Sequence, residues 1–591
     1  MRLTTDKITV ILQLILASFF VICVWFRFLL PYSYFSIVSI MAVFIAISIY
    51  LRMRRGFIVF QILLVFLLIN SVYGLSTHYS VLPYGDSYWD YSLVRMFLQS
   101  GRVYTFPYEP SSAILTWYSG WPVIHTLASI VSSVTGIAPF YVVQLVPIII
   151  SLCFFFVIYL LLEKASGALA LKSEVVYLGL LIFALSPDMI LWDTQFVRMS
   201  LGLLWLGLIF YITYLLLSQS SYRKRGIIVV GVLVAISLVA THHFVSFMAA
   251  LFLLTLFVFL FLGKRFGDGK IGSRLFPSNL YVPTISFAVL MLVCVLVWWE
   301  GFGQTTTILW DTVKQGVTRI INLFTGTSRI AFYVPQASYP AQLAPAWAVD
   351  LLRVRDAMML LPMLLGIPIL LIKKPRTPTR FFVVYGMVFF GLMFVINDVS
   401  FKIEPFRVVT LAMPFIALLT ATTYVEIKIR ANRIWKIVLP TIVTLLVLTS
   451  FLGLWAHSFA PMHLYNPAIK ISEVGEHPDV SRLNVFFETK IKLDDFNFIW
   501  GDDFGSLILL LNTSQLTKIT RLPDDLSTMG LNRPELFCEV SDLFLYKYYA
   551  SIYSYIQDPK NATTVAHAIG DRLQKTFDRI YDDGMYKLWE T

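Results

Sequence analysis

Residues 140–162 read FYVVQLVPIIISLCFFFVIYLLL, an unbroken apolar run without a charged side chain. A helix that crosses the hydrocarbon core of a bilayer needs about 17–25 apolar residues, so this run predicts a transmembrane helix. The whole chain has the same character: of its 591 residues 58% are hydrophobic and 14% are charged, and the mean hydropathy is +0.75. Soluble domains are about 45–50% apolar. We therefore expect lipid to solvate most of the protein.

Runs of similar length predict about thirteen membrane spans. The first run lacks a small-residue cleavage site and ends at Trp25, Phe26 and Arg27, so we interpret it as a retained helix and not as a signal peptide. The predicted fold is a polytopic α-helical membrane domain over residues 1–454 and a small extracytoplasmic α/β domain over residues 455–591. The spans begin near residues 8, 34, 56, 140, 175, 199, 226, 244, 281, 357, 381, 406 and 435.

The basic residues predict the orientation in the cell membrane, because Lys and Arg accumulate in short cytoplasmic loops. A cytoplasmic N-terminus and an odd number of spans place the C-terminal domain outside. The net charge of +11 then reflects topology, and we exclude a nucleic-acid partner. With the N-terminus inside, every short loop that falls inside is basic, at residues 52–55, 223–225, 264–265, 373–376 and 428–433.

Two long external segments, residues 75–139 and 300–356, interrupt the spans. Their uneven spacing disfavours the inverted repeats of many secondary transporters. We interpret the second segment as a flap at the lipid headgroups. In the C-terminal domain, residues 496–500 predict a strand, residues 506–511 a short helix and residues 581–586 a hairpin turn.

The first external segment contains YGDSYWDY at residues 84–91 and continues to Gly101. Its spacing predicts an amphipathic helix on the membrane surface, with Asp86 at the N-cap and Gly101 just past the end. Asp86 and Asp90 share one face of that helix. A carboxylate there could take the proton from an acceptor hydroxyl as the hydroxyl attacks an anomeric carbon. The alternative is a helix cap at Asp86 and a solvated first-turn acid at Asp90.

Polar residues at the ends of later spans are further candidates. His242 and His243 stand at an external turn, where imidazoles can donate to a phosphate, bind a metal or cap a helix. Arg407 could grip a phosphate bidentately with Glu404 setting its position, or the two could form a pair that ends a helix. Arg198 is a second candidate of the same kind, although Asp193 is near enough in sequence to pair with it.

These stretches and the topology resemble the GT-C superfamily of polyprenyl-phosphate-dependent glycosyltransferases, in particular archaeal and bacterial members related to oligosaccharyltransferases. The family carries an Asp-x-Asp or related acidic motif in the first large external loop. Here Asp86 and Asp90 have the spacing Asp-x-x-x-Asp, which leaves Asp86 as the main candidate and the role of Asp90 open. The Trp-Trp-Asp-Tyr-Gly motif of the oligosaccharyltransferase branch is not matched by residues 500–505.

The resemblance implies transfer of a sugar from a polyprenyl (dolichyl) phosphate-linked donor to an extracytoplasmic glycan, protein or lipid. Asp86 would be the general base, and Asp90 a second catalytic candidate. A divalent cation, Mg²⁺ or Mn²⁺, stays open as a cofactor. A transporter or lipid flippase, a non-catalytic scaffold and transfer of a whole glycan are the alternatives. The donor phosphate would be bound by Arg407, His242, His243 and Arg198, with Glu404 supporting.

Overall fold

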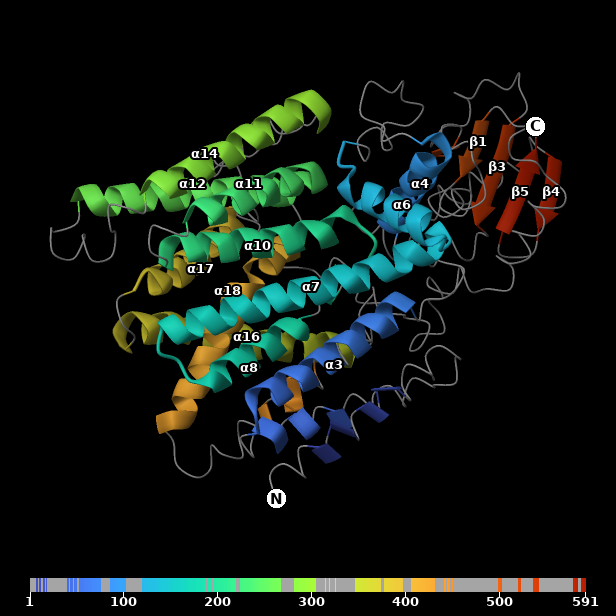
Figure 1. Cartoon of the computed structure of the whole chain (residues 1–591). Helices are drawn as coiled ribbons and strands as arrows, with labels where there is room; N and C mark the ends of the chain where they lie inside the picture. Colours follow the sequence, from blue (N-terminus) through green and yellow to red (C-terminus); the bar gives the residue numbers. More distant parts are fainter. Residues whose placement is uncertain are drawn as a thin grey trace.

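The computed structural model describes the helical part of the chain and five C-terminal strands (Figure 1). The predicted first two spans, the last span and the flap lie largely outside the described residues. The described residues are 53–75, 85–101, 120–218 without 187, 188, 191, 193 and 194, 224–266, 281–303, 346–373, 377–396, 405–430, the strands, and short pieces elsewhere.

The described part of the chain confirms a mostly helical membrane protein. Six of its helices hold stretches long and apolar enough to cross a membrane: α7 (Pro139–Ala168), α10 (Arg198–Ser218), α12 (His243–Phe266), α16 (Ala346–Lys373), α17 (Pro378–Ile396) and α18 (Pro405–Arg430). Shorter apolar stretches lie in α3 (Arg55–Leu75), α6 (Val123–Thr135), α8 (Ser173–Ala184), α11 (Lys224–Thr241) and α14 (Tyr281–Trp298). The number of thirteen membrane spans and the orientation of the chain in the membrane stay predictions.

Helix α10 lies in the middle of the bundle (Figure 1). It packs against α7 on one side and α11 on the other, and α14 packs against both α11 and α12. Helix α18 crosses behind this layer and contacts α8, α16 and α17. A helix surrounded in this way must be apolar on all sides, and α10 and α18 are the two most deeply buried of the candidate spans.

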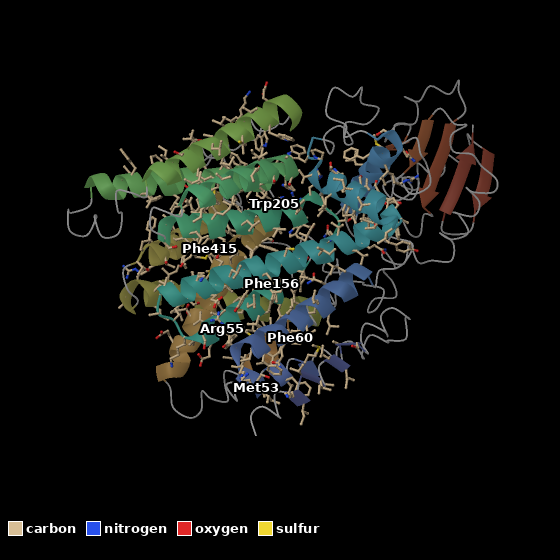
Figure 2. All side chains as sticks on the ribbon, in the orientation of Figure 1. Met53, Arg55, Phe60, Phe156, Trp205 and Phe415 are labelled. Atoms are coloured by element: carbon tan, nitrogen blue, oxygen red, sulfur yellow. The ribbon has the colours of Figure 1, made fainter. Side chains whose placement is uncertain are left out.

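Aromatic rings fill the centre of the bundle. Phe210 of α10 lies 5.2 Å from Phe252 of α12 and 5.1 Å from Phe415 of α18, measured between ring centroids. Gly386 of α17 gives Phe415 its space, because a Cβ atom there would lie 2.5 Å from the ring. Phe415 is among the side chains that fill the space between the helices (Figure 2). Edge-to-face rings of this kind add to the stability that burial provides.

Helices α16 and α18 are joined by hydrogen bonds at a proline. Pro362 has no N–H, so the carbonyl of Met358 loses the partner that an α-helix normally supplies. The Tyr424 hydroxyl of α18 donates to that carbonyl at 2.6 Å. The Thr420 hydroxyl donates to the next carbonyl, of Met359, at 2.7 Å. Donors from α18 therefore satisfy the carbonyl that Pro362 leaves without its helical partner, and bind the carbonyl beside it.

We predict that Tyr424→Phe lowers the free energy of unfolding by about 1 kcal/mol, because the Met358 carbonyl then loses its donor inside the bundle. Unfolding of the purified protein in mixed detergent micelles measures this loss. Tyr141→Phe is the matched control, because Tyr141 is 48% exposed on α7. Equal stability of the two variants would contradict the role given to Tyr424.

Helix α4 spans Gly85–Ser100, as the first external segment predicts, and Gly101 closes it with φ 65° and an N–H bond to the Phe97 carbonyl at 2.9 Å. The apolar face of α4 packs on other helices of the protein, and its place at the membrane surface stays a prediction. Leu93 and Phe97 are buried, and α4 packs against α6 and α7. The spacing of the sequence reveals which side chains of α4 share a face, but not what covers that face. Helix α6, which covers it, is too short to span a bilayer and was not predicted. Asp86 lies in the first turn, and its side chain is outside the described residues.

The five strands are β1 (Phe498–Gly501), β2 (Ile519–Arg521), β3 (Glu535–Val540), β4 (Asp578–Asp582) and β5 (Tyr586–Glu590). They form one sheet in the order β2-β1-β3-β5-β4, in which β1 runs parallel to β2 and β3, and β5 runs antiparallel to β3 and β4. The predicted strand at 496–500 and the terminal hairpin thus have counterparts. The predicted helix at 506–511 lies outside the described residues, so the α/β class of this domain stays a prediction.

Candidate functional site

The carboxylate of Asp90 is the centre of the candidate site. Its Oδ1 atom lies 2.7 Å from Nε2 of His125 on α6 and 3.2 Å from Nε of Arg198, the first residue of α10. Asp90 and His125 are completely buried, and Arg198 is 7% exposed. The reading of Asp90 as a solvated acid is therefore wrong. A buried carboxylate is tolerated because a cation and a hydrogen-bond donor compensate it.

His125 donates to Asp90 as a neutral ring. The pKa of His125 is lowered from its ordinary value, mainly because burial penalises the charged imidazole, while the hydrogen bond to Asp90 raises it and the charge of Arg198 lowers it further. A neutral imidazole carries one N–H, which the short contact assigns to Nε2. Within the described residues, Nδ1 has no hydrogen-bond partner. The positive charge opposite Asp90 therefore comes from Arg198.

Aromatic rings continue the site beyond Arg198. The Cζ atom of Arg198 lies 5.9 Å from the ring of Trp121, and the Trp121 ring lies 4.9 Å from that of His243. His243 in turn stacks on His242, with the centroids 4.8 Å apart and the planes 12° from parallel. The segment that carries Trp121 is tied to α14, because Trp298 donates from Nε1 to the Gly120 carbonyl at 2.9 Å.

The two histidines stack because a helix break separates them. Helix α11 ends at Thr241 and α12 begins at His243, so His242 lies between the helices and the 100° turn of a continuous helix does not apply. Nδ1 of His242 accepts from the Val245 N–H at 3.4 Å, the position of an N-cap. His242 thus caps the start of α12, and a helix cap was one of the three tasks that the sequence left open for these histidines.

Arg407 provides the second cation. Its Cζ atom lies 5.4 Å from the ring of Trp192. The buried Ser200 hydroxyl lies within hydrogen-bond distance of the backbone carbonyls of Trp192 and Gln195. The pKa of His242 is lowered well below its ordinary value by burial, then by His243, Arg198 and Arg407. The charges of both guanidinium groups thus contribute to the lowered pKa of this imidazole, after burial and His243.

The structure brings together five residues proposed from the sequence: Asp90, Arg198, His242, His243 and Arg407. The side chains of Asp86 and Glu404 are outside the described residues, as is Asp193, the expected partner of Arg198.

The sequence prediction missed His125, Trp121 and Trp192. A signal for His125 was present, because His125, Ser129 and Ser132 form a polar stripe at positions i, i+4 and i+7 on one face of the helix, and all three are buried. Such a stripe must face polar partners inside the protein. The two tryptophans carry no comparable pattern.

A divalent cation fits poorly at Asp90, because Arg198 already neutralises that carboxylate and would repel a second cation. In the part of the chain that the structure describes, no three His, Cys, Asp or Glu side chains gather in a metal-binding group. The prediction of Mg²⁺ or Mn²⁺ therefore depends on residues outside that part, and Asp86 is the first of them.

Solved structures share this fold. The crystal structure of ArnT from Cupriavidus metallidurans bound to undecaprenyl phosphate has a TM-score of 0.50 and 11% identity, over 90% of this chain and 97% of that one. The apo form of ArnT has a TM-score of 0.50 and 12% identity, over 89% of this chain and 97% of that one. The third structure is the archaeal oligosaccharyltransferase AglB from Archaeoglobus fulgidus in complex with an inhibitory peptide and a dolichol-phosphate. It has a TM-score of 0.49 and 11% identity, over 85% of this chain and 72% of that one.

No protein-family model and no curated protein matches the chain. At this level of identity the likeness to ArnT concerns the fold. The predicted architecture is thus confirmed as far as the fold that this chain shares with ArnT.

We predict that Asp90→Asn lowers the free energy of unfolding by about 3 kcal/mol, because the buried guanidinium group of Arg198 would lose its ion pair with the Asp90 carboxylate. Glu163→Gln is the matched control, since the Glu163–Arg55 pair at 2.9 Å is about one-third exposed on both sides, and such pairs contribute about 0–1 kcal/mol. Chemical unfolding of both variants gives the comparison. A loss at Asp90 no larger than that at Glu163 would contradict the buried pair.

Proposed function

We propose that the protein is a membrane glycosyltransferase that transfers a sugar from a polyprenyl-phosphate-linked donor to an extracytoplasmic acceptor. The observation that carries the proposal is the pair of guanidinium groups of Arg198 and Arg407, which lie on Trp121 and Trp192 and act on the stacked histidines. The GT-C fold supports it, because ArnT of this fold binds undecaprenyl phosphate.

Helix ends reinforce the attraction for an anion at this site. Arg198 is the first residue of α10, His243 is the first of α12, and Arg407 lies in the first turn of α18. The N-terminus of a helix carries partial positive charge and unpaired N–H groups. In the predicted topology the spans that begin near residues 199, 244 and 406 all start on the external side, where a lipid-linked phosphate would present its sugar.

The chemistry follows from the charge that develops during transfer. The bond between the anomeric carbon and the phosphate oxygen breaks, the acceptor oxygen bonds to that carbon, and the lipid phosphate leaves with the electron pair. Arg407 and Arg198, with the imidazoles of His242 and His243, would stabilise the negative charge on the departing phosphate. Glu404 would set the position of Arg407 from the preceding turn.

Asp86 is the proposed base for the acceptor hydroxyl. It precedes the buried Asp90 by four residues on α4, so both positions lie on one face of the helix. Asp90 is engaged with Arg198 and His125, which leaves Asp86 as the carboxylate for proton transfer. The predicted flap at 300–356 would exclude water that otherwise hydrolyses the donor.

A transporter or flippase is the second candidate. Such a protein should carry polar or broken helices near the middle of the membrane. In the six candidate spans of the described part, charged residues stand near the ends, and α10 has Arg198 alone. This distribution favours chemistry at the interface. A scaffold role and transfer of a whole glycan stay open as further alternatives.

We expect Asp86→Asn to reduce sugar transfer by about 10²–10⁴-fold, the usual contribution of a general base. Glycolipid and glycoprotein profiles of cells that carry the variant should show accumulation of a polyprenyl-linked sugar and loss of one glycan residue. The control is Glu163→Gln, at equal membrane levels of protein. Profiles like those of the wild type for Asp86→Asn would remove Asp86 as the base and put the transporter or scaffold ahead.

A further inference from the structure

Three helices meet at a single oxygen atom in the candidate site. Oδ1 of Asp90 on α4 is shared between Nε2 of His125 on α6 and Nε of Arg198 on α10. The contact to His125 is the shorter of the two, 2.7 Å against 3.2 Å. The position of the Arg198 guanidinium group therefore depends on the Asp90 carboxylate, and His125 on α6 holds that carboxylate.

His125 is itself firmly placed. Its ring meets that of Phe97 on α4 edge to face, with 5.9 Å between the centroids. One helical turn further on, the Ser129 hydroxyl donates to the His125 carbonyl at 2.8 Å and lies 3.4 Å from the Val94 carbonyl of α4. The imidazole therefore lies between α4 and α6, in contact with side chains of α4.

The carboxylate has few other restraints. Within the described residues, Oδ2 of Asp90 has no hydrogen-bond partner. Without the N–H of His125, the group would be restrained through Arg198 alone and could turn about its side-chain bonds. The guanidinium group would then lose the fixed direction that holds it on Trp121.

We propose that His125 is a positioning residue, which donates to Asp90 and thereby fixes the carboxylate that orients Arg198 toward the phosphate of the lipid-linked donor. This proposal rests on the proposed function, in which Arg198 binds that phosphate. His125 acts through Asp90 and Arg198 and does not touch the substrate, because its side chain is completely buried.

Proton transfer from the acceptor is a less suitable task for His125. A general base must reach the proton directly or through one water molecule. The side chains of both Asp90 and His125 have no exposed surface, and Nε2 of the ring is already engaged. The pair is therefore built to hold a cation in place.

Two amides of different length test the proposal. The side-chain nitrogen of Gln reaches the position of Nε2 in histidine, whereas that of Asn reaches only the position of Nδ1, so His125→Gln keeps the bond to Asp90 and His125→Asn loses it. The full chain in lipid nanodiscs is titrated with undecaprenyl phosphate and with undecaprenol. The ratio of the two affinities measures recognition of the phosphate, independently of binding of the isoprenoid chain.

We expect the wild type to prefer the phosphate. His125→Gln should keep the ratio within about threefold, and His125→Asn should lower it by about tenfold or more through loss of the oriented charge. Ser129→Ala is the control, because it removes contacts to the backbone carbonyls of His125 and Val94 and leaves the hydrogen bond between the His125 and Asp90 side chains in place. Its ratio should equal that of the wild type.

A double-mutant cycle separates positioning from a general structural effect. In an Arg198→Gln background, His125→Asn should change the ratio by less than about twofold, because the group that it positions is gone. If His125→Asn does not fold, Asp90→Glu replaces it, since it keeps the charge and moves the carboxylate by one methylene. This variant should lower the ratio as well.

The outcomes are distinct. Wild-type ratios for both His125→Asn and Asp90→Glu, or an undiminished effect of His125→Asn without Arg198, would overturn the positioning role and leave the phosphate site intact. A wild type that binds undecaprenol as tightly as undecaprenyl phosphate would overturn the proposed function, and the positioning role with it.

Discussion

A carboxylate buried at the end of a helical bundle must be neutralised, and the pairing of Asp90 with Arg198 meets this requirement. The pair joins α4, which belongs to the first external segment, to the first residue of the central helix α10. His125 adds α6 to the same contact. Breaking the pair would leave a charge in a low-dielectric environment, so the arrangement of these helices and the place of the cation are set together.

The same interaction prepares the site for an anion. A guanidinium group in water moves among many positions, whereas Arg198 is held by Asp90 at one nitrogen and lies on Trp121. Arg407 lies on Trp192 in a similar way. Charges fixed before the substrate arrives do not have to reorganise when negative charge develops, which is the main source of electrostatic catalysis. The ion pair thus connects the stability of the helical domain with its proposed chemistry.

Much of the fold was predictable, because the membrane requires long apolar runs and each helix satisfies its own backbone. Charges at the ends of spans also identified Arg198, Arg407 and the two histidines, since such charges are costly to keep near lipid. The burial of Asp90 was not predictable, because helical spacing does not reveal what covers a face. The turn at His242 was predicted from the two spans that flank it, whereas the stacking of His242 on His243 depends on side-chain directions that the sequence does not reveal. His125 could be recognised as part of the site only after the structure placed it beside Asp90 of α4.

The most direct test of the phosphate site is a cryo-electron microscopy structure of the full chain in nanodiscs with undecaprenyl phosphate. We predict density for the phosphate within hydrogen-bond distance of the guanidinium groups of Arg198 and Arg407, with Arg198 still paired to Asp90. Phosphate density elsewhere on the protein, or Arg198 and Arg407 in place with no phosphate beside them, would contradict the proposed function.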